Sequence, residues 1–238
     1  DVSGLTTWTN GLMTGAGITN ANGGISASGT LGKNINTSRI LNTAGTTTWT
    51  GTGNIQTGTG AVINNSGTWD CPSDASITLI YGGTATFNNL ANTFPTPPAT
   101  FKKSAGSGTT GVGITFNNSG SVIVQSGTIN LSGGGTSSGS FAGAAGTTLQ
   151  FGGGTHALGT TSSVNADTVV FNVGTVNVDG GYAAAAATTV SGATANFDTV
   201  GTVTSIGTAL TISSGVANFS SGEAINPTTL SLSGGTLQ

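Results

Sequence analysis

The chain has 238 residues, a formal net charge of −3, and only 5% charged residues. Its four basic residues are too few to neutralise a phosphate backbone, so the charge balance excludes a nucleic-acid partner. The single cysteine, Cys71, excludes an intrachain disulfide, and no apolar run is long enough to insert into a membrane as a helix.

The composition nevertheless favours a folded chain. Forty-two glycines and many polar residues resemble a disordered sequence, but disordered chains usually combine high net charge with few β-branched residues. Here Val, Ile, Leu, Phe and Thr alternate with polar residues along the whole length. This two-residue alternation predicts β-strands and not helices.

The N-terminal part, residues 1–40, fits the alternation least well, and we expect looser coils there within one domain that spans 1–238. The side chains predicted to point inward in this part are Trp8, Leu12, Ile18, Ile25, Leu31 and Ile35.

Four asparagines recur before similar corners, at spacings of 23, 24 and 29 residues: Asn42, Asn65, Asn89 and Asn118. Asparagine tolerates the left-handed backbone that such corners need. An Asn at one corner of each coil also bonds its amide to the Asn above and below, as in stacked amide ladders. We therefore predict a structural ladder of these four residues.

Residues 93–113 break the pattern with three prolines, two lysines and a Gly/Ser-rich run. Proline cannot donate a hydrogen bond to a strand ladder, so we expect this segment to leave the rod as a loop.

The segment 115–135 shows the repeating unit most clearly. Two inward residues on each short strand, such as Val122 and Val124, alternate with polar residues, and Ser-Gly or Gly-Gly corners separate the strands. The unit Gly-(Thr/Ser)-φ-x-φ, with φ inward and apolar, recurs at intervals close to multiples of a little under seven positions. Three strands then form a coil of about 20 residues, and stacking of copies buries the apolar faces. The arithmetic predicts an all-β, three-sided solenoid of roughly ten coils, about 50 Å long.

Beyond residue 135, four phenylalanines are spaced for partial inward stacks, and His156 aligns with inward residues. The phenylalanines are Phe151, Phe171, Phe197 and Phe219. Without a cysteine, carboxylate or second histidine at ligand spacing, His156 is predicted to be a core residue. Cys71 is likewise predicted to be a buried thiol.

The weak candidates for chemistry are Asp179 and Asp198, which are spaced by about one coil and each follow an inward residue. Stacked on adjacent coils, they would resemble the paired carboxylates that hydrolysis or calcium binding requires. Two solvated corner aspartates are the favoured interpretation, because residues 104–238 contain no lysine or arginine. We therefore expect no metal, no cofactor and no enzyme activity.

Two tyrosines beside glycine pairs, Tyr81 and Tyr182, are candidate glycan contacts, because an exposed ring stacks on a sugar. Ice binding through outward threonines is disfavoured, since runs such as Thr46, Thr48 and Thr50 do not recur at the coil period.

The segment FNNSGSVIVQSGTINLSGGGTSSGSFAGAAGTTLQFGGGTHALG resembles the Gly/Thr/Asn-rich repeats of large bacterial surface proteins, and so does the closing TLSLSGGTLQ. These include autotransporter passengers and filamentous-haemagglutinin-like adhesins. The resemblance covers most of residues 40–238. It implies a right-handed parallel β-helix, secretion and display at the cell surface, but names no ligand, because this fold hosts many functions.

These observations lead to one leading expectation and two alternatives. We expect a non-catalytic adhesive or spacer rod of a longer extracellular protein, with neighbouring repeats and surface polysaccharide as candidate partners. The first alternative is a filament subunit that stacks end to end with copies of itself, because the sequence stops within a repeat and the last coil would expose strand edges. The other is a polysaccharide-binding or polysaccharide-active β-helix, or a β-helix that binds ice.

Overall fold

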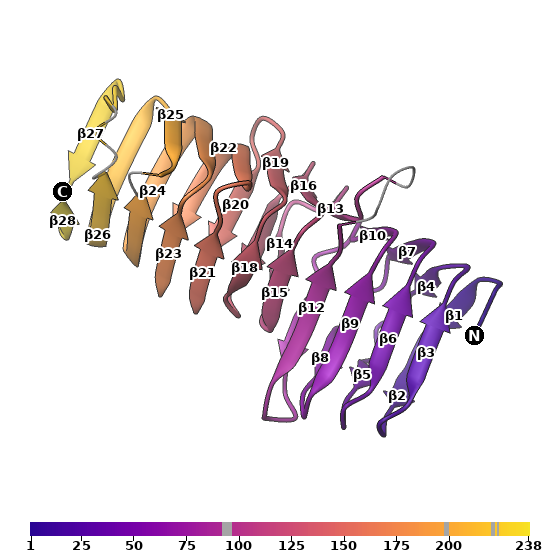
Figure 1. Ribbon diagram of the computed structural model, residues 1–238. Helices are drawn as coiled ribbons and strands as arrows, with labels where there is room; N and C mark the ends of the chain where they lie inside the picture. The colour runs from indigo at the N-terminus through magenta and orange to yellow at the C-terminus, as the bar shows by residue number, and fades with distance from the viewer. Residues whose placement is uncertain (92–96, 198–199, 220–221, 223) are drawn as a thin grey trace.

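A computed structural model describes residues 1–238 except 92–96, 198–199, 220–221 and 223. The described chain contains 28 strands and no helix. Successive strands run around a three-sided coil, and about 11 such coils stack into an elongated rod (Figure 1). The predicted parallel β-solenoid is thus confirmed.

The strands form three faces. The first face contains β1 (Thr6–Trp8), β4 (Ile25–Ala27), β7 (Thr46–Trp49), β10 (Thr68–Asp70), β13 (Thr100–Lys103), β16 (Ser121–Val124), β19 (Ser140–Gly143) and β25 (Thr202–Ile206). The second contains β2 (Gly11–Met13), β5 (Lys33–Ile35), β8 (Ile55–Thr57), β11 (Ile77–Leu79), β14 (Thr109–Val112), β17 (Thr128–Leu131), β20 (Thr148–Phe151) and β27 (Thr229–Leu232). The third contains β3 (Ile18–Ala21), β6 (Ile40–Thr43), β9 (Ala61–Asn65), β12 (Ala85–Asn89), β15 (Thr115–Asn118), β18 (Gly135–Ser137), β21 (Thr155–Leu158), β23 (Thr175–Val178) and β28 (Thr236–Leu237). Three longer strands bend around corners and belong to more than one face: β22 (Ser163–Phe171), β24 (Gly181–Phe197) and β26 (Ala209–Phe219).

Each strand pairs in parallel with the strand one coil later. Thr155 pairs with Thr175, and Thr175 pairs in turn with Thr194. Coils this short leave only a few residues at each corner. The predicted length of about 20 residues per coil therefore holds in this part of the rod, at the short end of the range for solenoid repeats.

The alternation of inward and outward residues in β16 and β17 explains why these segments form strands of a coil. Val122, Val124, Ile129 and Leu131 are buried, whereas the residues between them point outward. A corner glycine such as Gly174 has a φ of 87°, a conformation that disfavours other residues. A Cβ on Gly174 would also collide with the carbonyl oxygen of Gly154 one coil earlier. The glycines thus allow the corners to stack closely.

Aromatic side chains stack inside the rod. The rings of Phe151 and Phe171 stack with centroids 5.6 Å apart, and those of Phe197 and Phe219 with centroids 4.4 Å apart. Phe171 meets Phe197 edge to face at 5.8 Å. The four phenylalanines predicted to stack therefore form two pairs, because the first two lie on the second face and the others on the third.

Residues 1–40 are more regular than predicted, because β1 to β5 all pair in register with the next coil. Trp8, Ile25 and Ile35 are buried as expected. The other three predicted inward residues, Leu12, Ile18 and Leu31, are 54%, 58% and 58% exposed. Leu12 shows the reason: its neighbour Met13 packs against the core, so the alternation turns Leu12 outward.

The prediction that residues 93–113 form one excursion is wrong for most of the segment. β13 pairs with β10 and β16, and β14 pairs with β11 and β17, so both strands belong to the stacked coils. Pro97 and Pro98 precede β13 and remove no hydrogen bond from it. Residues 92–96, which overlap the start of this segment, lie outside the described residues.

Candidate functional site

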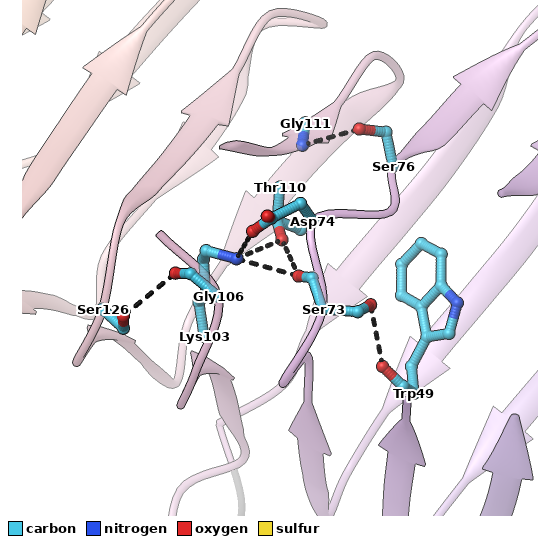
Figure 2. A network of polar contacts seen from close by, with 9 residues as sticks. All are labelled: Trp49, Ser73, Asp74, Ser76, Lys103, Gly106, Thr110, Gly111 and Ser126. Atoms are coloured by element: carbon cyan, nitrogen blue, oxygen red, sulfur yellow. Dashed lines mark hydrogen bonds and ion pairs between the residues drawn. The ribbon is translucent and has the colours of Figure 1, made fainter. Parts of the chain in front are cut away.

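A lysine inside the rod forms the centre of the polar cluster shown in Figure 2. Lys103, the last residue of β13, is fully buried, and its partner in the next coil is the apolar Val124. Its Nζ donates to the Ser73 carbonyl oxygen at 2.8 Å, Asp74 Oδ1 at 2.6 Å and Thr110 Oγ1 at 3.3 Å. These three partners use all three ammonium hydrogens.

The cluster joins corners that are distant in sequence. Thr110 Oγ1 donates to the carbonyl oxygen of Ser73 at 2.8 Å, and the Ser73 hydroxyl donates to the Trp49 carbonyl oxygen at 3.0 Å (Figure 2). The side chain of Asp74 is 48% exposed, so the ion pair connects the interior to the surface. The hydrogen bond from Lys103 is the main cause that lowers the pKa of Asp74, and a hydrogen bond from the Gly108 backbone adds to it.

A second lysine, Lys33, also points into the rod and is fully buried. It occupies an inward column between Gly11 and Ile55, and Nζ donates to the carbonyl oxygens of Leu31 at 3.2 Å and Gly53 at 3.4 Å. The ion pairs found among the described residues involve Lys102 and Lys103 and not Lys33. Burial lowers the pKa of Lys33.

Three of the four asparagines predicted to form a ladder do so inside the rod. Asn65 Nδ2 donates to Asn89 Oδ1 at 2.9 Å, and Asn89 Nδ2 donates to Asn118 Oδ1 at 2.8 Å. Asn89 Nδ2 also donates to the carbonyl oxygen of Ser121 at 3.0 Å. All three side chains are at most 1% exposed, so the ladder supplies partners to buried polar groups at the corner.

Asn42 belongs to a different ladder, which corrects the prediction. It lies one position earlier in its strand and pairs with Asn64, whereas Thr43 pairs with Asn65. Asn42 Nδ2 donates to Asn20 Oδ1 at 2.6 Å, and Asn64 Nδ2 donates to Asn42 Oδ1 at 2.8 Å. This outward ladder continues through Asn88 and Asn117 at 2.8 and 2.9 Å. The four corner sequences look alike, but a one-residue shift changes the face.

The two candidate acids are only partly described. Asp179 is half-buried, and its backbone N–H donates to the Leu158 carbonyl oxygen at 2.8 Å. The preceding residues of the two acids, Val178 and Phe197, pair across adjacent coils. Asp198 itself lies outside the described residues, so the predicted pair stays a prediction. Among the described residues, no three His, Cys, Asp or Glu side chains are grouped to hold a metal ion.

The two candidate glycan contacts differ in their exposure. Tyr81 is 39% exposed, and its hydroxyl donates to Asn34 Oδ1 at 2.6 Å, which fixes the ring on the outside of the rod. Tyr182 is 1% exposed and contacts the hydroxyl of Thr188 at 2.8 Å, and burial raises its pKa. The prediction that Tyr182 contacts a glycan is therefore wrong, because the alternation within β24 turns this ring inward.

The single histidine and the single cysteine are both core residues, as predicted. His156 is 2% exposed, donates from Nε2 to the Gly153 carbonyl oxygen at 3.0 Å, and packs edge to face on Phe151. Burial lowers the pKa of His156 and raises the pKa of the fully buried Cys71 thiol. Burial thus favours the uncharged form of each side chain.

The inward positions of Lys33 and Lys103 are not among the predictions from the sequence. The available signal was the spacing itself: Phe101 is inward, so the alternation places Lys103 inward two positions later.

The chain matches no protein-family model, no curated protein and no solved structure. In the part of the chain that the structure describes, no helix has the length and apolarity to cross a membrane.

Proposed function

We propose that this chain is a non-catalytic rod segment of an extracellular surface protein, serving as a stalk or adhesive spacer. The observation that carries the proposal is the unbroken register of the third face. From β3 to β28, each strand of this face pairs in parallel with the strand one coil later. A stack of this kind holds its two ends at a fixed separation, which is the mechanical requirement for a spacer.

The interior supports the same proposal. Inward ladders of apolar, aromatic and amide side chains connect each coil to the next, and Lys103 and Asp74 join corners of adjacent coils. In such a solenoid, stability is approximately a sum of coil and neighbour terms, so the rod can be lengthened without a new core. The resemblance to repeats of surface proteins supplies the proposed location.

The spacer role is tested by displaying the chain between a cell-surface anchor and a small reporter domain. The distance of the reporter from the membrane is then measured by super-resolution or energy-transfer microscopy. We expect the rod to hold the reporter at a fixed distance of about 50 Å. A flexible linker of equal residue number is the control, and an equally broad distance distribution for both chains would contradict the proposal.

The absence of catalysis is tested separately with soluble and insoluble polysaccharides, by measuring new reducing ends. We expect none. Product release that disappears in Asp179→Asn would show that the carboxylate pair is catalytic and would replace the stalk proposal with an enzymatic one.

End-to-end stacking into filaments is the second candidate. The outermost coils carry strands that pair on one side only, and such open edges accept a further parallel coil, from the same chain or another copy. Electron microscopy at rising protein concentration tests this candidate. Filament length that grows with concentration would support it, and single rods at every concentration would exclude it.

A further inference from the structure

The third face carries two straight columns of outward side chains, which we call the Thr/Asn face. The first column is β-branched and consists of Ile18, Ile40, Val62, Thr86 and Thr115, and then Thr155, Thr175, Thr194, Val216 and Thr236. It is interrupted once, between Thr115 and Thr155, where the intervening coil has Gly134. The second is Asn20, Asn42, Asn64, Asn88, Asn117, Thr136, Ala157, Asn177, Asn196 and Asn218. Threonines thus occupy consecutive coils of this column at Thr86 and Thr115 and again from Thr155 to Thr194, on a different face from the run at Thr46, Thr48 and Thr50.

The two columns of the Thr/Asn face carry no charge, because none of their side chains is ionisable. At the N-terminal end, the Asp1 carboxylate accepts a hydrogen bond from Asn20 Nδ2 at 2.6 Å. The amides are held in line by hydrogen bonds to one another, as in Asn196 Nδ2 to Asn177 Oδ1 at 2.8 Å. In Figure 1 the strands of this face lie side by side toward the viewer along the whole rod. The face is thus a rigid surface that repeats at the strand spacing of about 4.8 Å.

We propose that the Thr/Asn face packs against the same face of a second copy of this chain, so that two rods associate side by side. Two copies have an identical repeat, so every coil of one rod meets an equivalent coil of the other. Identical columns of like charges would repel each other, and the two columns themselves carry none. Columns of Asn, Thr, Val and Ile side chains on aligned strands are suited to close interdigitation between two sheets.

The area of the Thr/Asn face is large enough for a contact between two copies of the chain. The stacked coils give a length of about 50 Å, and about four residues per strand give a width of about 13 Å. The contact then buries roughly 1,300 Å² over the two copies, which lies within the range of specific protein interfaces. The face contains no aromatic or arginine anchor, so we expect an affinity in about the micromolar range.

The exposed apolar residues at one end of the face favour a protein partner over a polar lattice such as ice or a crystalline polysaccharide. Ile18 is 58% exposed, and Ile40 and Val62 continue its column on the next two coils. Burying an aliphatic column against its own copy gains hydrophobic free energy in proportion to the area covered.

The test is sedimentation velocity of the full chain from micromolar to near-millimolar concentration. The variant is Thr115→Lys with Thr175→Lys, which places charges on the Thr/Asn face. The matched control is Thr128→Lys with Thr168→Lys, two threonines that are also half-buried and outward and lie on non-adjacent coils, but on the second face. Circular dichroism and thermal melting of both double variants establish that each folds like the parent.

We expect the parent and the second-face control to dimerise with the same concentration dependence, and the Thr/Asn-face variant to remain monomeric. A parent that is monomeric throughout would overturn the proposal. So would a Thr/Asn-face variant that associates like the control, because the contact would then lie elsewhere, for example at the ends of the rod. A monomeric parent that adsorbs to ice or to insoluble polysaccharide, with adsorption lost in the Thr/Asn-face variant, would assign the face to that partner instead.

Discussion

Lys103 occupies an inward position whose partner in the next coil is the apolar Val124. Its side chain is nevertheless charged. Its aliphatic stem extends along the interior, and its ammonium reaches an acceptor set at the corner between the first and second faces. A buried charge is tolerated only when it is paired and hydrogen-bonded, and this site meets both conditions. The alternation of inward and outward residues in the strand therefore directs the Lys103 side chain inward. The acceptors at the corner provide the ion pair and hydrogen bonds that its ammonium group requires.

Asp74→Asn tests the importance of that pairing. The variant keeps an oxygen near Lys103 but removes the counter-charge from a buried ammonium, so we expect a loss of about 1–3 kcal/mol in the free energy of unfolding. Urea denaturation measures the loss. Asp179→Asn is the control, because Asp179 has no ion pair among the described residues. Equal stability of the two variants would show that Asp74 contributes only as a solvated carboxylate.

The buried His156 side chain predicts that the free energy of unfolding depends on pH. Burial lowers its pKa in the folded state, so below about pH 6.5 the unfolded chain binds a proton that the folded chain does not. The stabilisation that depends on a neutral His156 is present in full above that pH. The free energy of unfolding should fall as the pH drops below it. His156→Val, which copies its coil neighbour Val176, should remove this part of the pH dependence. Melting curves from pH 7.5 to about 5 provide the measurement, and parallel pH profiles for the two proteins would contradict the assignment.

At the scale of elements, adjacent asparagines of one strand have different environments. In β12, Asn89 points inward and bonds to Asn65 and Asn118, while Asn88 points outward and bonds to Asn64 and Asn117. Both ladders run along neighbouring coils of the third face, but only the inner one replaces water as the partner of buried groups. Their contributions to stability should therefore differ.

Asn89→Ala removes the Asn89 donor from the buried Asn118 Oδ1, whereas Asn65 Nδ2 keeps the carbonyl oxygens of Gly67 and Thr100 as acceptors. We therefore expect a loss of about 1–3 kcal/mol for the unsatisfied Asn118 oxygen. Asn88→Ala removes half-exposed hydrogen bonds that water replaces, so the expected loss is about 1 kcal/mol or less. Hydrogen exchange of the β12 and β15 amides, together with thermal melting, compares the variants. A larger effect of Asn88→Ala would reverse our assignment of the inner ladder.

The same strands show what could be predicted from the sequence. The Gly-(Thr/Ser)-φ-x-φ unit determines strand length, corner and inward face within a few residues, so the solenoid, the buried His156 and the buried Cys71 could be predicted. Register between coils depends on pairing partners a full coil away, and coil length varies. For this reason the predictions for Asn42 and Tyr182, and the part of the predicted 93–113 loop that forms β13 and β14, are wrong. Polar side chains at inward positions, such as Lys33, need acceptors that only the folded corner assembles.

At the scale of the whole molecule, the rod is held by stacked backbone hydrogen bonds and inward packing with few ion pairs. The described residues contain two, Asp70 with Lys102 at 3.2 Å and Asp74 with Lys103 at 2.6 Å. The second is anchored in the interior, where salt screens it little. The melting temperature should therefore change only slightly between low salt and about 1 M sodium chloride, a concentration that screens surface charges within a few ångströms. A large drop measured by differential scanning calorimetry would mean that surface electrostatics dominate.

The shape of the dilute chain in solution distinguishes a rod of stacked parallel coils from any globular arrangement. Small-angle X-ray scattering of the dilute monomer should give the pair-distance distribution of a rod about 50 Å long. Inserting a second copy of residues 155–193, which adds two coils in register, should lengthen the rod by about 10 Å without changing its cross-section. A compact, roughly isotropic particle, or an insertion that widens the particle without lengthening it, would contradict the account.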